Sequence, residues 1–404
     1  MTTNSTNDCL AHGYAAPPFE PVKIEFMRNF RERGDVGAAC AVYYQGQKVV
    51  DLWGGYRDNQ RGEPWNADTL VPVFSTTKGV AALTLAVAHS QGLFDYEDTV
   101  ATYWPEFAHH GKADITIRQM MSFQAGLCYI DQKIDAPVLA DLDRLAQLLA
   151  QQKPAWRPGD YHGYHLFTAD AVASELIRRR DAKHRSLGQF FQEEIAQPLG
   201  LEFYIGTPAS IAEDRIAVIQ AFNPLETLLH LDTMPRGMLG LLVPHSLVRR
   251  VLLNVNFKTP AHMALPPYRG VEFPGGNGIG QVRSLAKVFG LLAIGGCALG
   301  LKPATLDAIT QPARLPKYGI EDQVLKTTII YSLGFLKPFP TFTFSSSSKA
   351  FGAAGTGGSF AFADPDAQLG FAYAPNKLGF HQFNDPREQA LREAVYQGIA
   401  RARG

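Results

Sequence analysis

The chain has 404 residues, of which 46% are apolar and 19% charged. This is the composition of an ordinary globular protein and excludes a disordered or fibrous chain. Its 38 basic residues balance its 38 acidic residues. Because no stretch concentrates Lys and Arg, we expect no nucleic-acid partner.

Nothing in the sequence indicates export or a membrane. The start MTTNSTNDCLAHGY has neither a basic segment nor an apolar run of about 7–15 residues, so we expect no secretory signal. Apolar runs such as 80–88 are far shorter than the ~20 residues of a membrane-spanning helix. Cys9, Cys40, Cys128 and Cys297 are scattered, without C-x-x-C or zinc-ligand spacing. We therefore expect free thiols, no catalytic cysteine, no metal, no cofactor and a cytoplasmic location, with a homodimer left open.

Local patterns predict strands at both ends of the chain and helices between them. Residues 38–44 and 48–53, joined by Gln45-Gly46-Gln47, predict a β-hairpin. Ser75 opens an apolar helix that stops at a glycine. Further helical patterns run over 142–150, 168–179, 187–195 and 386–401, and late strand patterns over 327–333, 359–363 and 369–374.

The distribution of these elements predicts an α/β (α+β) fold in which one antiparallel sheet, flanked by helices, is built from both ends of the chain. Residues 1–74 and 281–404 would form the α/β lobe. Residues 75–280 would form a mainly helical lobe, with the active site between the two. Apolar residues of the helical lobe, such as Phe222, Leu228, Met234 and Leu239, are expected to pack in its core rather than to line an acyl pocket.

A serine and a lysine three positions apart share one face of a helix, where the amine reaches the hydroxyl and activates it. The spacing occurs at Ser75/Lys78, Ser284/Lys287 and Ser346/Lys349. Ser346 lies among serines without helical periodicity, and Ser284 is expected to cap a helix. Ser75 precedes a strongly apolar helix, at its positive dipole end, which favours it as a nucleophile. The competing interpretation is a plain cap, with Lys78 extending to solvent.

Two segments resemble the serine β-lactamase and penicillin-binding-protein superfamily, in its class C-like branch of family VIII carboxylesterases. The first is the stretch around Ser75, DTLVPVFSTTKGVAALTLAVAHSQGLFDYEDTVATYWPEF, and the second is ITIRQMMSFQAGL, which follows it. The resemblance extends from about residue 13 to residue 401. It implies a β-lactamase-like fold and an acyl-enzyme on Ser75, with Lys78 beside it. In WRPGDYHGYHLFTADAVASELI the tyrosine of the second motif corresponds to Tyr164, and Tyr161 is the weaker candidate.

The third motif of this family corresponds to Ala353-Ala354-Gly355 within FGAAGTGGSFAFADPDAQLGFAY. By resemblance, the backbone N–H of Thr356 joins that of Ser75 as an oxyanion hole, and Gly355 lets a strand edge approach the substrate. The alternative interpretation of this segment is a glycine-rich hairpin.

This sequence departs from the family at three polar positions: Ala353 replaces a basic residue, Phe123 a histidine and Leu166 an asparagine. A β-lactam carries a carboxylate that the basic residue would bind, so its loss favours neutral esters. The resemblance implies a serine carboxylesterase for small or acyl-chain esters. The alternatives are an acyltransferase or an amide or β-lactam hydrolase, and, ranked below them, a non-catalytic binding protein. Whether Lys78 or Tyr164 is the general base is left open.

Overall fold

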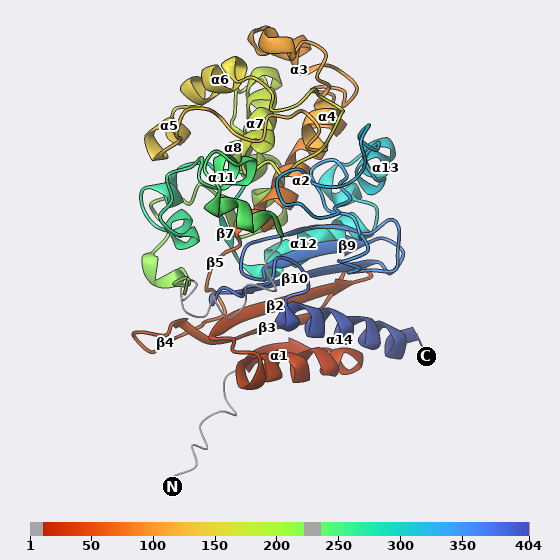
Figure 1. Cartoon of the computed structure of the whole chain (residues 1–404). Helices are drawn as coiled ribbons and strands as arrows, with labels where there is room; N and C mark the ends of the chain where they lie inside the picture. Colours follow the sequence, from red (N-terminus) through yellow and green to blue (C-terminus); the bar gives the residue numbers. More distant parts are fainter. Residues whose placement is uncertain (1–10, 222–235, 404) are drawn as a thin grey trace.

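The computed structural model describes residues 11–221 and 236–403. Figure 1 shows an antiparallel sheet with helices α1 and α14 below it, α12 directly above it, and the remaining helices stacked over α12. The strands are β1 Ala11–Ala15, β2 Gly37–Tyr44, β3 Gln47–Asp58, β4 Glu63–Pro64, β5 Val71–Pro72, β6 Phe203–Ile205, β7 Gly278–Gly280, β8 Phe351–Ala354, β9 Phe360–Asp364 and β10 Leu369–Pro375.

The helices of six or more residues are α1 Glu20–Glu32, α2 Thr77–Ser90, α6 Leu142–Gln151, α7 Thr168–Arg180, α11 Leu247–Leu252, α12 Val282–Ala293, α13 Pro303–Thr310 and α14 Pro386–Arg403. The shorter ones are α3 Val100–Tyr103, α4 Ile117–Met121, α5 Ala136–Ala140, α8 Leu187–Phe191 and α9 Gln197–Leu199. None of the helices in the described ranges is long and apolar enough to cross a bilayer.

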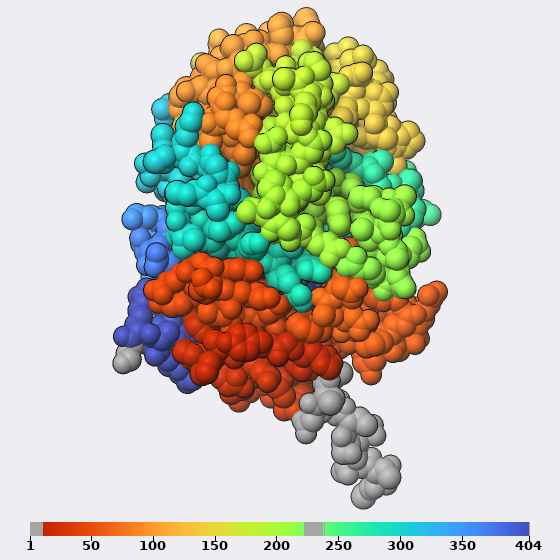
Figure 2. Space-filling model, turned by 180° about the vertical axis from the view of Figure 1, so that it is seen from behind, coloured from red at the N-terminus to blue at the C-terminus, as the bar shows by residue number. Residues whose placement is uncertain are grey.

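The main sheet joins the two ends of the chain. Its order is β1-β3-β2-β10-β9-β8, with β4 paired to β3, and neighbouring strands run antiparallel. Figure 2 shows the red N-terminal and blue C-terminal segments side by side at the base of the molecule, where α1 packs against α14. The expected antiparallel sheet flanked by helices is thus confirmed. The lobe boundaries at 74/75 and 280/281 stay a prediction.

The predicted hairpin is present as β2 and β3. Its turn is Gln45-Gly46, because Tyr44 already pairs with Gln47. Both turn residues have positive φ, 51° and 76°, as a turn matched to the twist of the strands requires. Strand β2 is buried along most of its length, since α12 covers one face of the sheet and α1 with α14 the other.

Helix α12 contacts the sheet where two glycines meet. A Cβ on Gly370 of β10 would lie 2.1 Å from the backbone nitrogen of Gly290. A Cβ on Gly290 would lie 2.6 Å from the Cβ of Tyr43. Glycine is therefore needed at both positions, because any side chain would push the helix off the sheet. Strand β8, which ends beside the site described below, forms the edge of this sheet opposite β1.

One strand prediction is wrong. Residues 327–333 form no named strand and make only the isolated bridges Glu321↔Thr328 and Tyr331↔Leu336. The segment instead bonds to a loop and to helix α13: the Tyr331 hydroxyl donates to Asp322 at 2.8 Å, and the Ser332 hydroxyl donates to the carbonyl of Ile309 in α13 at 2.5 Å. These tertiary contacts override the β propensity of the sequence. The helix predicted over 187–195 is α8 followed by a π-helical turn, Gln192–Ala196.

Candidate active site

Ser75 lies in a strained turn between β5 and α2. A single 3₁₀ turn, Phe74–Thr76, precedes the α-helix, which begins at Thr77 rather than at Ser75. Phe74 is buried and has a φ of +48°, which a bulky side chain rarely adopts. The Thr77 hydroxyl donates to the carbonyl of Phe74 and accepts from the N–H of Gly278 at 2.9 Å, which holds the turn. Strain of this kind concentrates at functional sites because the surroundings must enforce it.

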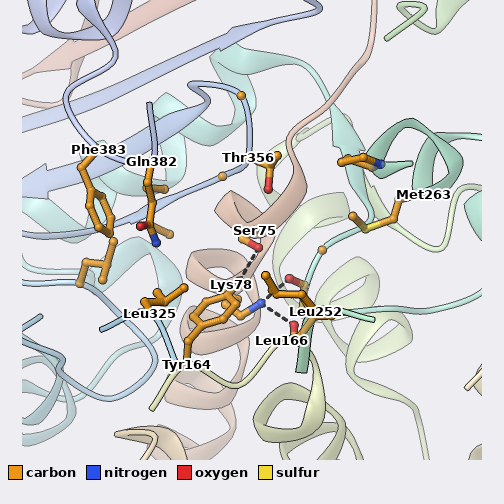
Figure 3. Close-up of a pocket in the computed structure, with 18 of the residues that line it drawn as sticks. Ser75, Lys78, Tyr164, Leu166, Leu252, Met263, Leu325, Thr356, Gln382 and Phe383 are labelled. Atoms are coloured by element: carbon orange, nitrogen blue, oxygen red, sulfur yellow. Dashed lines mark hydrogen bonds between the residues drawn. The ribbon is translucent and has the colours of Figure 1, made fainter. Parts of the chain in front are cut away.

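The structure brings together the three side chains that the motifs single out (Figure 3). The Ser75 Oγ lies 2.7 Å from the Oη of Tyr164, which is 89 positions away in the sequence. The Lys78 Nζ lies 5.0 Å from the centre of the Tyr164 ring. The other tyrosine of the segment, Tyr161, packs on Tyr318 with ring centres 5.0 Å apart. Tyr164 is therefore the tyrosine that meets Ser75.

Lys78 is buried and does not extend to solvent as the competing interpretation required. Its Nζ donates to the backbone carbonyls of Leu166, at 2.7 Å, and Gly275, at 2.5 Å. A third contact is the Oδ2 of Asp170, at 3.8 Å. Backbone from two distant loops and a carboxylate from α7 thus hold the amine one helical turn from Ser75.

Two further titratable groups lie beside Lys78. Burial raises the pKa of Asp170 to about 6, although the nearby Lys78 charge opposes the shift. Burial lowers the pKa of His165 to about 4, and the Lys78 charge adds to that shift. The His165 Nδ1 lies 2.6 Å from the carbonyl of Gly163, which can only accept, so Nδ1 carries the proton. His165 is therefore neutral near pH 7 and adds no charge to the site.

Phe123, where the family carries histidine, has a φ of +60° and lies behind Tyr164. Its ring packs edge-on against Tyr331, with centres 4.7 Å apart, stacks on His165 at 5.4 Å, and lies 6.4 Å from the ring of Tyr164. The replacement thus supports the phenol ring with apolar surface. Leu166, in place of asparagine, offers Lys78 a backbone carbonyl instead of a side-chain amide.

Thr356 lies across Ser75 from Tyr164, in the turn after β8 (Figure 3). Among residues 11–221 and 236–403, neither its N–H nor that of Ser75 has a hydrogen-bond acceptor. Gly355 faces the nucleophile turn closely: a Cβ there would lie 2.3 Å from the carbonyl oxygen of Val73 and 2.3 Å from the Ser359 hydroxyl. Gly355 lines the cavity. A glycine is needed there because the turn after β8 packs against the backbone carbonyl of Val73, two residues before Ser75.

A cavity of about 410 Å³ opens over Ser75 and Thr356. Its walls are mainly apolar and come from distant segments, including Leu252, Phe257, Met263, Phe273, Leu325, Ile329, Phe335 and Phe383. Its charged or titratable lining beyond Lys78 and Tyr164 includes Lys258, His381 and Tyr331. Size and lining are those of a site for a small organic molecule.

Other candidates from the sequence have different roles. Ser284 was expected to cap a helix, but α12 begins after Gln281 without a side-chain cap, and the Ser284 hydroxyl accepts from the N–H of Glu202 at 3.0 Å. Lys287 donates to the carbonyl of Leu199 at 2.6 Å, and Lys349 pairs with Asp366 at 3.1 Å.

Leu239, expected in the core, is 63% exposed. Phe222, Leu228, Met234 and Cys9 lie outside the described residues.

Two contributors to the site were missed. Asp170 is an acidic residue within the apolar helical pattern TADAVASELI, and a charge on the buried face of a helix was the available signal. Gly275 belongs to the run PGGNG, whose glycines indicated a close backbone approach. A Cβ on Gly275 would lie 2.4 Å from the Leu166 carbonyl oxygen. Within the described ranges, no group of three or more His, Cys, Asp or Glu residues lies where it could hold a metal ion.

Comparisons with known proteins show which family the chain belongs to. The family model described as beta-lactamase matches residues 26–396. The esterase/beta-lactamase LipL of Mycobacterium tuberculosis (strain ATCC 25618 / H37Rv) is 31% identical over 388 residues, which cover 91% of this chain and 83% of LipL.

Solved structures are similar over nearly the whole chain. A crystal structure of a family VIII carboxylesterase superposes with a TM-score of 0.85 at 35% identity, covering 96% of this chain and 99% of that one. EstA from Arthrobacter nitroguajacolicus Rue61a superposes with a TM-score of 0.82 at 29% identity, with the same coverage of 96% and 99%. The resemblance that the motifs indicated is confirmed: the chain belongs to the β-lactamase family, in the branch similar to the family VIII carboxylesterases.

Proposed function

We propose that this chain is a serine carboxylesterase that forms an acyl-enzyme on Ser75, with Lys78 and Tyr164 handling the proton. The observation that carries the proposal is the 2.7 Å contact between the Ser75 Oγ and the Tyr164 Oη at the floor of a mainly apolar cavity. A hydroxyl becomes a nucleophile when a positioned group takes its proton, and this contact has the required length. The descriptions of LipL as an esterase/beta-lactamase and of the similar structure as a family VIII carboxylesterase support the same reaction class.

The catalytic cycle has two stages. The Ser75 Oγ attacks the ester carbonyl, its proton passes into the Tyr164/Lys78 network, and that network returns a proton to the leaving alcohol. Water then attacks the acyl group and releases the acid. The amides of Ser75 and Thr356 are the proposed donors to the oxyanion, which fits their lack of other acceptors within the described ranges.

The cavity favours uncharged acyl groups. Ala353 supplies only a methyl group where the family carries a basic side chain, and Lys78 is already bonded to two carbonyls. Lys258 also lines the cavity, but it is exposed, so water and salt screen its attraction for a substrate carboxylate. We expect neutral esters to be turned over far faster than β-lactams, because binding a carboxylate in an apolar cavity without a paired cation is unfavourable.

The test compares esters and labelling. The protein should hydrolyse p-nitrophenyl esters, and a fluorophosphonate should label it at Ser75. Ser75→Ala should abolish labelling, and Tyr164→Phe should lower kcat/KM by ~10²-fold or more. Tyr161→Phe is the matched control and should change kcat/KM little. Undiminished labelling of Ser75→Ala, or equal effects of the two tyrosine variants, would contradict the assignment.

Three outcomes of the same assays separate the alternatives. Transfer of the acyl group to an added alcohol or amine in preference to water would identify an acyltransferase. Faster turnover of an amide or a β-lactam than of any ester would identify the corresponding hydrolase. Reversible binding of esters without turnover or labelling would identify a binding protein.

We also propose that the protein is cytoplasmic, that its substrate is a small molecule and that it has no nucleic-acid partner. In the part of the chain that the structure describes, Cys40, Cys128 and Cys297 are unpaired, which fits a reducing compartment. Burial raises the pKa of both Cys40 and Cys128, so neither is an activated thiolate. A homodimer stays a prediction that sedimentation velocity would check.

A further inference from the structure

Asp170 is a buried carboxylate that the chemistry proposed for Ser75, Lys78 and Tyr164 does not use. It lies in the first turn of α7, only 2% exposed. Its Oδ2 has no hydrogen-bond partner among the described residues and lies 3.8 Å from the Lys78 Nζ. Burying an ionised carboxylate without full hydrogen bonding is costly, so its retention calls for a function.

A helix-capping role does not account for this position. An acidic residue in the first turn interacts favourably with the helix dipole, but it would do so equally well from the solvent-exposed face of the helix. Asp170 instead faces the interior where Gly275 leaves room: a Cβ on Gly275 would lie 3.1 Å from the Asp170 Oδ2. The carbonyl of that same glycine accepts from Lys78 at 2.5 Å. Carboxylate, glycine and lysine therefore form one packed unit.

The groups that surround the Lys78 Nζ are acceptors or negative charge. Two are the carbonyls of Leu166 and Gly275, and the third is the carboxylate of Asp170. An ammonium has three N–H donors and no lone pair, so these surroundings suit the charged form of Lys78 better than the neutral amine. We propose that Asp170 is a positioning residue that holds Lys78 as an ammonium and so makes Tyr164 the base for Ser75.

The proton balance follows from this arrangement. In the proposed cycle the pair of Lys78 and Tyr164 holds one proton, and the Asp170 charge favours its location on Lys78. Tyr164 then acts as a phenolate 2.7 Å from the Ser75 Oγ. As the bond from Oγ to the carbonyl carbon forms, the Oγ proton moves to the Tyr164 Oη and the carbonyl electron pair moves to the oxygen. As the carbon–alkoxy bond breaks, Tyr164 gives that proton to the leaving oxygen.

The other titratable groups around this unit do not replace Asp170. His165, in the loop before α7, is buried, and its pKa is lowered to about 4, so it is neutral across the working range. Beyond Tyr164, the Asp322 carboxylate accepts from the Tyr331 hydroxyl at 2.8 Å, and burial raises its pKa although the nearby His162 opposes the shift. Burial raises the pKa of Tyr331 as well. Within the described ranges, Asp170 is the carboxylate paired with Lys78.

The inference rests on the proposed function and is tested by the pH dependence of Ser75 reactivity. The rate of Ser75 labelling by a fluorophosphonate should be measured from pH 4.5 to 9 for the unmodified protein and for Asp170→Asn, together with kcat/KM for a p-nitrophenyl ester. Asparagine has the shape of the protonated carboxyl, so only the charge is removed. We expect Asp170→Asn to label ~10-fold more slowly at pH 8. The two rates should converge below about pH 6, where Asp170 itself takes up a proton.

A merely structural role predicts a different result. It would lower the rate by a factor that does not change with pH. Glu175→Gln is the matched control, because Glu175 is a buried carboxylate on the same helix that pairs with Arg178 and Arg179 instead of Lys78. Its rate ratio to the unmodified protein should be independent of pH. A pH-independent ratio for Asp170→Asn would overturn the inference.

A double-mutant cycle with Tyr164→Phe completes the test. If Asp170 acts through the phenolate, Asp170→Asn should have no further effect once Tyr164 is phenylalanine; additive losses would contradict the inference. If the Asp170→Asn protein does not fold, the unmodified protein still decides, because its labelling rate should show an inflection near pH 6. An unmodified protein that neither labels nor hydrolyses esters would instead refute the proposed function. Normal activity with no Asp170 effect would refute this inference alone.

Discussion

At the scale of single residues, the site concentrates side chains whose environments oppose their charged forms. Burial raises the pKa of Asp170 to about 6 even though Lys78 favours its ionised form. Burial lowers the pKa of the adjacent His165 to about 4. Groups with displaced pKa values are typical of functional sites, because a structure optimised for stability alone would not bury them. The two shifts have opposite effects on stability as pH changes.

The Asp170 carboxylate should therefore cost stability at neutral pH. Its folded pKa, about 6, lies above its usual value, so between about pH 4 and 6 the folded state keeps a proton that the unfolded chain has lost, and stability falls as pH rises. We expect Asp170→Asn to be more stable than the unmodified protein at pH 7, by on the order of 1 kcal/mol. The difference should vanish near pH 4. Urea denaturation at pH 4, 5 and 7 measures it, and a less stable variant at pH 7 would contradict the assignment of the charge.

At the scale of elements, the position of α2 relative to β8 and α12 decides where Lys78 lies. The helix follows the Ser75 turn and is buried along almost its whole length. Gly79, the residue after Lys78, lies close to both of these neighbouring elements. A Cβ there would lie 2.8 Å from the ring of Phe289 on α12 and 2.9 Å from the Cβ of Ala353 on β8. The small residue at 353, which departs from the family, thus also packs against the nucleophile helix.

Gly79→Ala should therefore destabilise the protein despite the better helix propensity of alanine. Propensity favours alanine by about 1 kcal/mol, whereas a methyl group forced into a filled interior costs about 1–3 kcal/mol and displaces its neighbours. We expect a net loss of stability together with slower labelling of Ser75. Gly270→Ala is the control, because a Cβ there meets nothing within 4 Å. Chemical denaturation of the two variants decides, and equal stabilities would show that α2 can move.

At the scale of the whole molecule, a buried ionic network joins both ends of the chain to the turn that carries Thr356. Arg387 of α14 donates to Asp35 at 3.0 Å, to Asp385 at 2.8 Å and to the carbonyl of Gly357 at 2.9 Å. Asp35 precedes β2, and the hydroxyl of Tyr373 on β10 also donates to it, at 2.7 Å. The segment 355–358 is thus braced from the N-terminal and C-terminal parts together.

Removing the cation should be more damaging than the loss of one hydrogen bond. Arg387→Met leaves Asp35 and Asp385 buried without their partner, which we expect to cost about 3–5 kcal/mol. Arg403→Met, at the exposed end of the same helix, should be neutral within about 0.5 kcal/mol. Urea denaturation at pH 7 compares the two, and ester turnover should fall only in Arg387→Met because Gly357 loses its brace. Equal stability of the two variants would show that the network is dispensable.

Features that depend on neighbours in the sequence were predictable. The hairpin of β2 and β3, helices α6 and α7 and the pairing of Ser75 with Lys78 on one turn follow from periodicity, glycine turns and the three-residue spacing. The resemblance added Tyr164 and the order of the motifs. Where local preference competed with long-range contacts it failed: residues 327–333 have the composition of a strand, yet Tyr331 bonds to Asp322 in a loop and Ser332 to Ile309 in α13.

The sequence by itself determined the fold class, the nucleophile candidate and the reaction class, because each rests on local patterns or on motifs in a set order. Only the tertiary structure decided how closely Tyr164 approaches Ser75, that Leu166 and Gly275 supply carbonyls to Lys78, and that Asp170 lies beside the amine. The physical reason is that these contacts join residues about 90 to 200 positions apart, so their distances depend on how whole elements pack and no local spacing encodes them.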